Sequence, residues 1–171
     1  MAGFQMTVKI DDLAVREFLK KALIAGQDLT PAMKNIGEYM LLRTAERFAG
    51  QHDPDGKPWK QLAYHTLMAG YKKKKYKKKG GLTKGFHGYL AARQILMQSG
   101  HLSRLAYKAS PDSIMVGTTP PSKAYAAIQQ FGGKAGRGHK ITIPARPYLG
   151  INDDDAKEAT RIVTEFIGLS K

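Results

Sequence analysis

The side chains best suited to catalysis are scattered along this chain. Its histidines are His52, His65, His87, His101 and His139. No two of them are four residues apart, the spacing that places two metal ligands on one face of a helix. Each is therefore interpreted as a surface or half-buried side chain, without a ligand. The run Asp153–Asp155 could bind a divalent cation, but negative charge at the start of a helix explains it without one.

A glycine-rich stretch, "GGKAGRGHK" at 132–140, superficially resembles a phosphate-binding loop. Gly133 and Gly138 have the required separation, but His139 and Lys140 follow, where a lysine and then a hydroxyl are needed. The stretch also lies between an expected helix and an expected strand, the reverse of the required order. No serine has the Gly-x-Ser-x-Gly context of a nucleophile, and cysteine is absent. The sequence predicts no enzyme, no cofactor and no metal.

The densest charge is "YKKKKYKKKGG" at 71–81. Its lysines are Lys72, Lys73, Lys74, Lys75, Lys77, Lys78 and Lys79. Like charges at this density repel one another, so we expect a flexible loop over about 70–85. The loop could be a solvated tip, a targeting signal, or a contact with DNA or an acidic partner. In the DNA case the lysines would attract phosphates without reading sequence, and salt would weaken the attraction.

Length and composition indicate one domain, residues 1–171. Hydrophobic residues make up 42% of the chain, a normal share for a globular core. The net charge is +14, and removing the seven lysines of the run leaves 14 − 7 = +7, so the excess is only partly local. No apolar stretch approaches the ~18 residues of a membrane span, and no secretory signal precedes the domain, so we expect no membrane partner. The absence of cysteine fits assembly in a reducing cytoplasm.

The hydrophobic periodicity predicts an α+β fold. Residues 4–10 alternate as a strand does, and long helices are expected over about 12–25 and 31–49. A short helix over 62–69, a helix from Phe86 to about Leu96 and strands within 102–109 and 113–118 follow. The remaining expected elements are a helix over 122–131, an extended stretch over 140–151 and a last helix capped by 152–155. The prediction is a small antiparallel or mixed β-sheet packed against two long helices and a C-terminal helix.

Several stretches occur in a specific order: Phe48 ahead of "DPDGKPW", then "SGHL" at 99–102, "VGT" at 116–118, "YAAIQQFGG" at 125–133 and "IPARPYLGI" at 143–151. This succession resembles the phage virion morphogenesis, or tail-completion, family of Mu-like and related tailed phages, over roughly residues 4–169. The family often has histidine at the position of Gln129, and the lysine insertion is not part of its pattern.

The resemblance implies a structural protein of the virion tail or neck, assembled in the host cytoplasm, that completes the tail or neck and supports head–tail joining. It implies a homo-oligomeric ring, a hexamer, around the DNA passage. The expected partners are neighbouring neck, connector, tail tube or tail terminator proteins, and non-specifically the genomic DNA. The alternative is a sequence-independent nucleic-acid-binding protein that uses the lysines of 71–79.

Candidate contact residues follow from the same segments. Pro144 and Pro147 hold Arg146 at a fixed angle, and its planar fork suits a carboxylate or a pair of backbone carbonyls. Arg146 could form an intrachain salt bridge that braces the last strand, or it could cross a subunit boundary.

Two interpretations are also open for the aromatic side chains of Tyr125, Phe131 and Tyr148, which could pack within the protomer or contact a neighbouring subunit. Most of their area is expected in the core. Arg137 lies in the glycine-rich loop 134–140. We expect this loop not to pack against itself, and either to move freely or to become ordered against a neighbour.

Overall fold

The computed structural model describes residues 5–8, 28–69, 71, 73, 75–78, 80–120 and 123–168. Its elements are β1 (Gln5–Val8), α2 (Thr30–Gly50), α3 (Tyr64–Ala69), α4 (Lys84–Ala92), β2 (Leu105–Ala109), β3 (Ile114–Thr118), α5 (Lys123–Phe131), β4 (Gly133–Ala135), the 3-10 turn η1 (Arg137–His139), β5 (Ile141–Ile143) and α6 (Asp153–Phe166). The helix expected over about 12–25 lies outside the described residues. Within them, none of the helices combines the length and apolar character that a bilayer-spanning segment requires.

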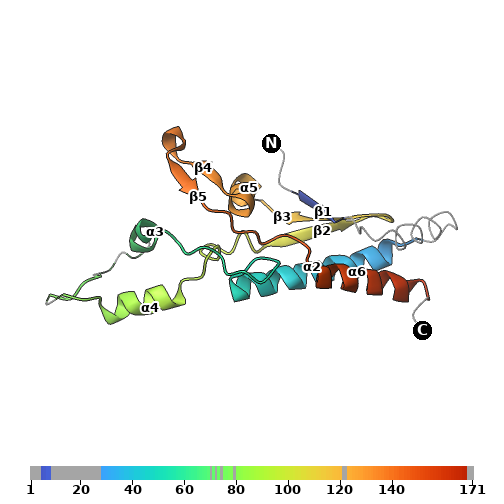
Figure 1. The fold of residues 1–171 in the computed structure, drawn as a ribbon, viewed down its shortest axis with the longest axis horizontal. Coiled ribbons are helices and arrows are strands. Elements are labelled where there is room, and N and C mark those ends of the chain that lie inside the picture. The colour runs from blue at the N-terminus through green and yellow to red at the C-terminus, as the bar shows by residue number, and fades with distance from the viewer. Residues whose placement is uncertain are drawn as a thin grey trace.

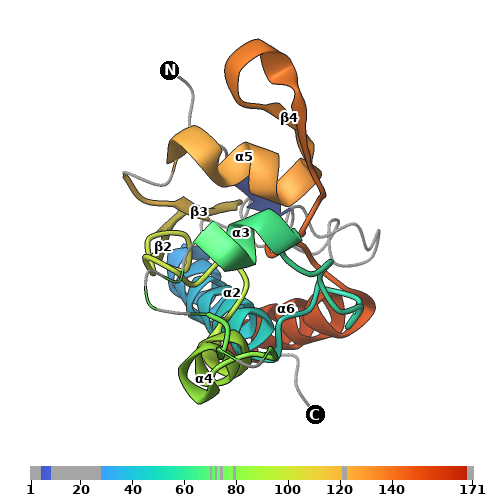
Figure 2. The ribbon, with the colours of Figure 1, turned by 90° about the vertical axis from the view of Figure 1, so that its left-hand side faces the viewer.

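A three-stranded antiparallel sheet forms the centre of the molecule, in the order β1-β3-β2. Helices α2 and α6 lie side by side beneath it, and α5 lies on the opposite side (Figures 1 and 2). In the β2–β3 pair, Tyr107 is opposite Val116 and Ala109 is opposite Ile114. The predicted α+β class and the antiparallel sheet are confirmed.

Helix α2 supplies the main apolar face of the core. Met33, Ile36, Met40, Thr44 and Phe48 recur every three or four residues, and all of them are buried, as the periodicity predicts. Pro31 occupies the first turn, where a proline costs no hydrogen bond.

One glycine sets the distance between α2 and the sheet. A Cβ at Gly37 would lie 2.5 Å from the ring of Tyr107, so the helix can approach the sheet this closely only with glycine there.

The described residues of 60–98 form an arm that extends away from the body and carries α3 and α4 (Figure 1). Phe86 is buried in a small aromatic cluster, its ring centroid 5.1 Å from that of Tyr71 and 6.0 Å from that of Tyr89. Helix α4 ends at Ala92, earlier than predicted, because Arg93 is extended and Leu96 has a positive φ of 63°.

The lysine-rich segment lies at the tip of the arm, where the described residues form a turn. Tyr76 bridges Leu82 in antiparallel fashion, and the Lys77 amide donates to the Gly81 carbonyl. Helix α4 already begins at Lys84, capped by the Thr83 hydroxyl, within the range expected to be loop. The flexibility of this segment stays a prediction.

A second sheet corrects the prediction for the glycine-rich stretch. Strands β4 and β5 pair as an antiparallel hairpin, with Lys134 opposite Thr142, and η1 closes its end. The expectation that 134–140 could not pack against itself was wrong, because the strands "GKA" at 133–135 and "ITI" at 141–143 satisfy each other's backbone groups. The hairpin, residues 133–143, stands out from the body (Figure 1).

Candidate interaction site

Arg146 is anchored inside the protomer. Its side chain is only 5% exposed; Nε donates to the Lys60 carbonyl at 2.8 Å and Nη2 to the Gln61 carbonyl at 3.2 Å. It therefore braces the proline-stiffened segment 143–150 within the chain, through a pair of backbone carbonyls. The prediction of an intrachain salt bridge was wrong in its partner, since no carboxylate is bonded to Arg146 among the described residues. Burial lowers the pKa of this guanidinium.

Gln130, which the sequence did not single out, holds the next part of the segment. Its side-chain oxygen accepts from the amides of Tyr148 at 3.0 Å and Leu149 at 3.1 Å. Its side-chain nitrogen donates to the Leu149 carbonyl at 2.6 Å. The sequence signal that could have identified Gln130 is its place on the apolar face of the helix expected over 122–131, because a buried side-chain amide needs hydrogen-bond partners.

Tyr148 is a core residue. It is fully buried, with its ring centroid 5.4 Å from that of Phe48 and its hydroxyl donating to the Ala126 carbonyl at 3.5 Å. Burial raises the pKa of this hydroxyl. Its side chain has no exposed area to offer a neighbouring subunit, so it can influence such a contact only by positioning its segment. Trp59 is also buried, and its Nε1 donates to the Pro147 carbonyl at 2.8 Å.

A buried ionic cluster joins α2 to α6. Asp155 is fully buried and accepts from Arg47 Nη2, from Arg43 Nε at 2.9 Å and from the Tyr39 hydroxyl at 3.0 Å. Arg47 also donates to the Gly150 carbonyl at 2.8 Å.

The pKa of each group in this cluster follows from burial and charge together. Burial alone would raise the pKa of Asp155, but hydrogen bonds led by that from Arg43 outweigh it, so its pKa lies below the usual value. Burial together with the bond to Asp155 raises the pKa of Tyr39 to about 12. Burial lowers the pKa of Arg47.

The helix-start interpretation of the aspartate run is supported. Asn152 and Asp155 form a capping box at the start of α6, while Asp153 and Asp154 are exposed. Asp155 is occupied by arginines, which leaves it unavailable to a cation. Across the residues that the structure describes, no group of three or more histidines, aspartates and glutamates could hold a metal ion.

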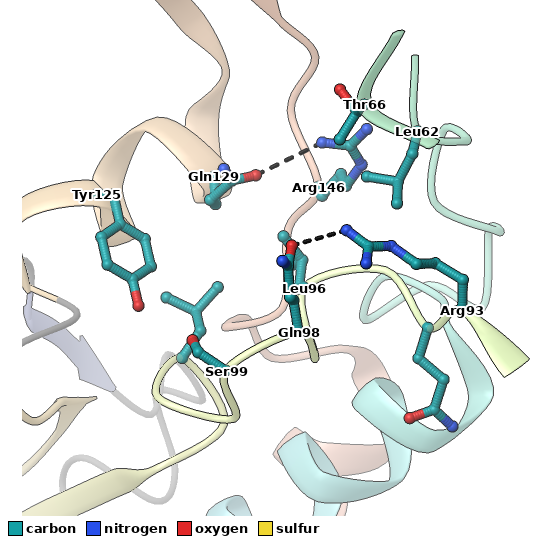
Figure 3. Close-up of a pocket in the computed structure, with 11 residues that line it drawn as sticks. Leu62, Thr66, Arg93, Leu96, Gln98, Ser99, Tyr125, Gln129 and Arg146 are labelled. Carbon is teal, nitrogen blue, oxygen red and sulfur yellow. Dashed lines mark hydrogen bonds between the residues drawn. The ribbon is translucent and has the colours of Figure 1, made fainter. Parts of the chain in front are cut away.

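A cleft of about 260 Å³ opens where the arm meets the body (Figure 3). It is lined by Leu62, Thr66, Arg93, Gln94, Leu96, Gln98, Ser99, Leu102, Tyr125, Gln129 and Arg146. Two predicted contact residues, Tyr125 and Arg146, thus meet at one site. Arg146 Nη1 reaches Gln129 Oε1 at 3.5 Å, and Arg93 Nη2 reaches Gln98 Oε1 at 2.7 Å.

The charge of the chain is strongly segregated. Residues 56–111 contain thirteen lysines and arginines and no aspartate or glutamate. Residues 113–152 contain five lysines and arginines and again no aspartate or glutamate. These two segments build the arm, the cleft and the hairpin. The acidic residues lie in α2, in the following loop, in α6 and at Asp112, and before residue 29.

The remaining predicted contact residues lie at the surface. Phe131 is 64% exposed at the end of α5, which corrects the expectation that most of its area is in the core. Arg137 is exposed at the end of the hairpin, and Ile141, four residues later at the start of β5, is 61% exposed.

Among the lysines of the run, Lys73, Lys77 and Lys78 are exposed and Lys75 is half-buried. Lys72, Lys74 and Lys79 lie outside the described residues. Contact of these lysines with DNA stays a prediction.

Comparison with known proteins gives two matches. The model of the phage virion morphogenesis family matches residues 10–167. Over 55 residues the chain is 47% identical to the Mu-like prophage FluMu G protein 2 of Haemophilus influenzae. The aligned part covers 32% of this chain and 38% of that protein, so this chain spans well under half of the curated relative's length. No solved structure matches the chain.

Proposed function

This chain belongs to the phage virion morphogenesis family, and from that premise we propose that it completes the tail or neck of a phage particle and supports head–tail joining. Its role is structural, in phage assembly. Under this proposal its copies form a ring, a hexamer, around the passage for DNA, within the tail or neck of the virion. The ring contacts neighbouring neck, connector, tail tube or tail terminator proteins.

The observation that carries this proposal is the pair of projections on a well-packed body. The arm and the hairpin extend from it in different directions (Figures 1 and 2). Both present large exposed apolar side chains, Tyr64 and Tyr76 on the arm and Ile141 on the hairpin. Exposed apolar groups on projecting elements suit a contact with another polypeptide, and α2, α5 and α6 each expose one further large apolar side chain among the described residues.

The predicted contact residues divide into two roles under this proposal. Phe131, Arg137 and Tyr125 reach the surface or the cleft and are placed to touch a neighbour. Arg146 and Tyr148 hold the proline-stiffened segment in shape from within.

Complementation of a phage that lacks this gene tests the proposal. We expect the null phage to produce filled heads and tails that fail to join, and the wild-type gene to restore joined particles in electron micrographs. A variant with the hairpin residues 134–142 replaced by a short glycine–serine turn should fold but not restore joining. Normal particles from the null phage would refute the assignment.

A second function, sequence-independent binding of nucleic acid, is favoured by the unbroken positive charge of 56–111. Replacing the seven lysines of 71–79 by serine should then weaken duplex DNA binding and flatten its dependence on salt, since fewer counterions are released. A control variant replaces three lysines outside the run, Lys57, Lys60 and Lys108, and should have a smaller effect. Equal DNA affinity of the run variant and the wild type would remove this candidate.

A further inference from the structure

We propose that the cleft between Arg93 and Arg146 receives the carboxylate of Asp153 from a neighbouring copy of this chain. The inference rests on the proposed ring, and it names the contact that would join one subunit to the next. The argument combines the donors of the cleft, the absence of an acid near it and one carboxylate elsewhere in the chain.

The cleft presents positive donors whose capacity is only partly used. Arg146 gives two of its nitrogens to backbone carbonyls, and its third, Nη1, has a long 3.5 Å contact with Gln129. Arg93 stacks on Tyr89, with its guanidinium carbon 5.3 Å from the ring centroid, and its Nε is buried with no hydrogen-bond partner. Both arginine side chains border the same cavity, from the proline-stiffened segment and from the chain after α4 (Figure 3).

The chain itself supplies no counter-charge at this place. Every residue that lines the cleft comes from 56–111 or 113–152, and neither segment contains an aspartate or glutamate. No ion pair of the half-buried Arg93 or the buried Arg146 exists among the described residues, whereas Arg47, buried like Arg146, has one. A buried guanidinium without an opposite charge is costly, and a carboxylate that docks from outside would offset that cost.

Asp153 is the complementary group. Among the acids that the structure describes, it is the one whose carboxylate has neither a hydrogen bond nor an ion pair in the chain. Its neighbours in the first turn are engaged, Asp154 with Lys157 at 3.4 Å and Asp155 within the buried cluster. Asp153 is exposed at the start of α6, where it can enter a cleft on another molecule.

The lining of the cleft favours a side chain of a protein over a phosphate of DNA. Leu62, Leu96 and Leu102 contribute apolar walls beside the two arginines. The cavity is slightly smaller than the roughly 300 Å³ at which small-molecule pockets begin, so it suits one inserted side chain. A duplex backbone would need an open basic surface, such as the tip of the arm.

Charge reversal on the full-length protein, followed by native mass spectrometry and sedimentation, tests the contact. Arg93→Glu should raise the dissociation constant of the assembly by about tenfold or more, and Asp153→Arg should do the same. Arg104→Glu and Asp112→Arg make the same charge changes at exposed sites away from the cleft and should leave assembly unchanged. The double variant Arg93→Glu with Asp153→Arg should recover most of the association.

The outcomes separate this contact from the proposed function. Assembly that withstands both single changes, a double variant that recovers nothing, or a wild-type protein that stays monomeric up to about millimolar concentration would each overturn the contact. Restoration of joined particles by the Arg93→Glu gene, with an unaltered ring, would overturn it while leaving the tail-completion role intact. Equal melting temperatures of the variants and the wild type confirm that folding is not what changed.

Discussion

Two buried arginines, one in the helical body and one at the base of the arm, are satisfied in different ways. Arg47 is 1% exposed and pairs with the buried carboxylate of Asp155. Arg146 is 5% exposed and has only neutral acceptors, the carbonyls of Lys60 and Gln61 and the amide of Gln129. The body thus cancels its internal charge, while the base of the arm retains a net positive charge.

The difference separates the parts of the molecule that stabilise it from the parts available for contacts. The body joins α2 to α6 through an ion cluster whose members lie more than a hundred residues apart in sequence, so it depends on the protomer alone. The arm and hairpin come from acid-free segments and carry exposed apolar side chains. Under the proposed function, these two parts are the ones that contact other molecules.

Removing the carboxylate from the body should have the largest effect on stability. Asp155→Ala leaves Arg47 buried without a counter-charge and removes the capping box of α6, so we expect a loss of about 3–5 kcal/mol in the free energy of unfolding. Urea denaturation followed by circular dichroism measures it. Asp154→Ala, at an exposed position in the same turn, should change the stability by no more than about 0.5 kcal/mol.

The corresponding change at the base of the arm should cost less. Arg146→Ala breaks the bonds to the Lys60 and Gln61 carbonyls but leaves no charge stranded, so we expect about 2–3 kcal/mol from the same denaturation experiment. Arg146→Lys keeps the charge but cannot span two carbonyls at once, and it should recover less than half of the loss. If Arg146→Ala proved as damaging as Asp155→Ala, the distinction between the two arginines would be wrong.

Lowering the pH should reduce the folding stability of the protein through protonation of the same carboxylate, that of Asp155. The pKa of Asp155 in the folded protein lies below its ordinary value of 3.8. Its ionised form therefore adds stability that is complete above that ordinary value and is lost as the pH falls through the lower folded value. Subtracting the pH–stability profile of Asp155→Asn from that of the wild type should show this loss only below about pH 4. A difference that stays constant down to pH 2 would contradict it.

The parts of the fold that periodicity predicted are those whose residues are close in sequence. The apolar spacing of 33–48 placed α2 and its buried face correctly, and Asn152 with Asp155 marked the start of α6. The strands around 105–118 followed from local hydrophobic periodicity. In each case neighbouring residues carry the information, because capping and amphipathicity act within a few turns of chain.

The unpredicted parts depend on long-range contacts. Arg47 and Asp155 look like ordinary surface charges in the sequence, and only the packing of α2 on α6 buries them together. The β4–β5 hairpin was missed because β4 consists of Gly133, Lys134 and Ala135 and gives no strand signal, although β5 lies within the stretch that was predicted to be extended. The cleft combines the arm, α5 and the proline-stiffened segment, so its two arginines could not be paired from spacing alone.

The smallest effect on folding is expected at the hairpin. The same change, isoleucine to serine, can be made in the body and in the hairpin, and the two losses of stability can be compared. Ile114→Ser removes a side chain that is 2% exposed in the core and should cost about 3 kcal/mol or more. Ile141→Ser acts on a side chain that is 61% exposed and should stay within about 0.5 kcal/mol in the same denaturation assay.

If the hairpin serves contact, Ile141→Ser should nevertheless reduce the yield of joined particles in complementation, because a stable protomer would have lost an apolar anchor. A variant that is both fully stable and fully active would show that this exposed isoleucine has no role in assembly. The proposed contact surface would then be supported by the arm alone.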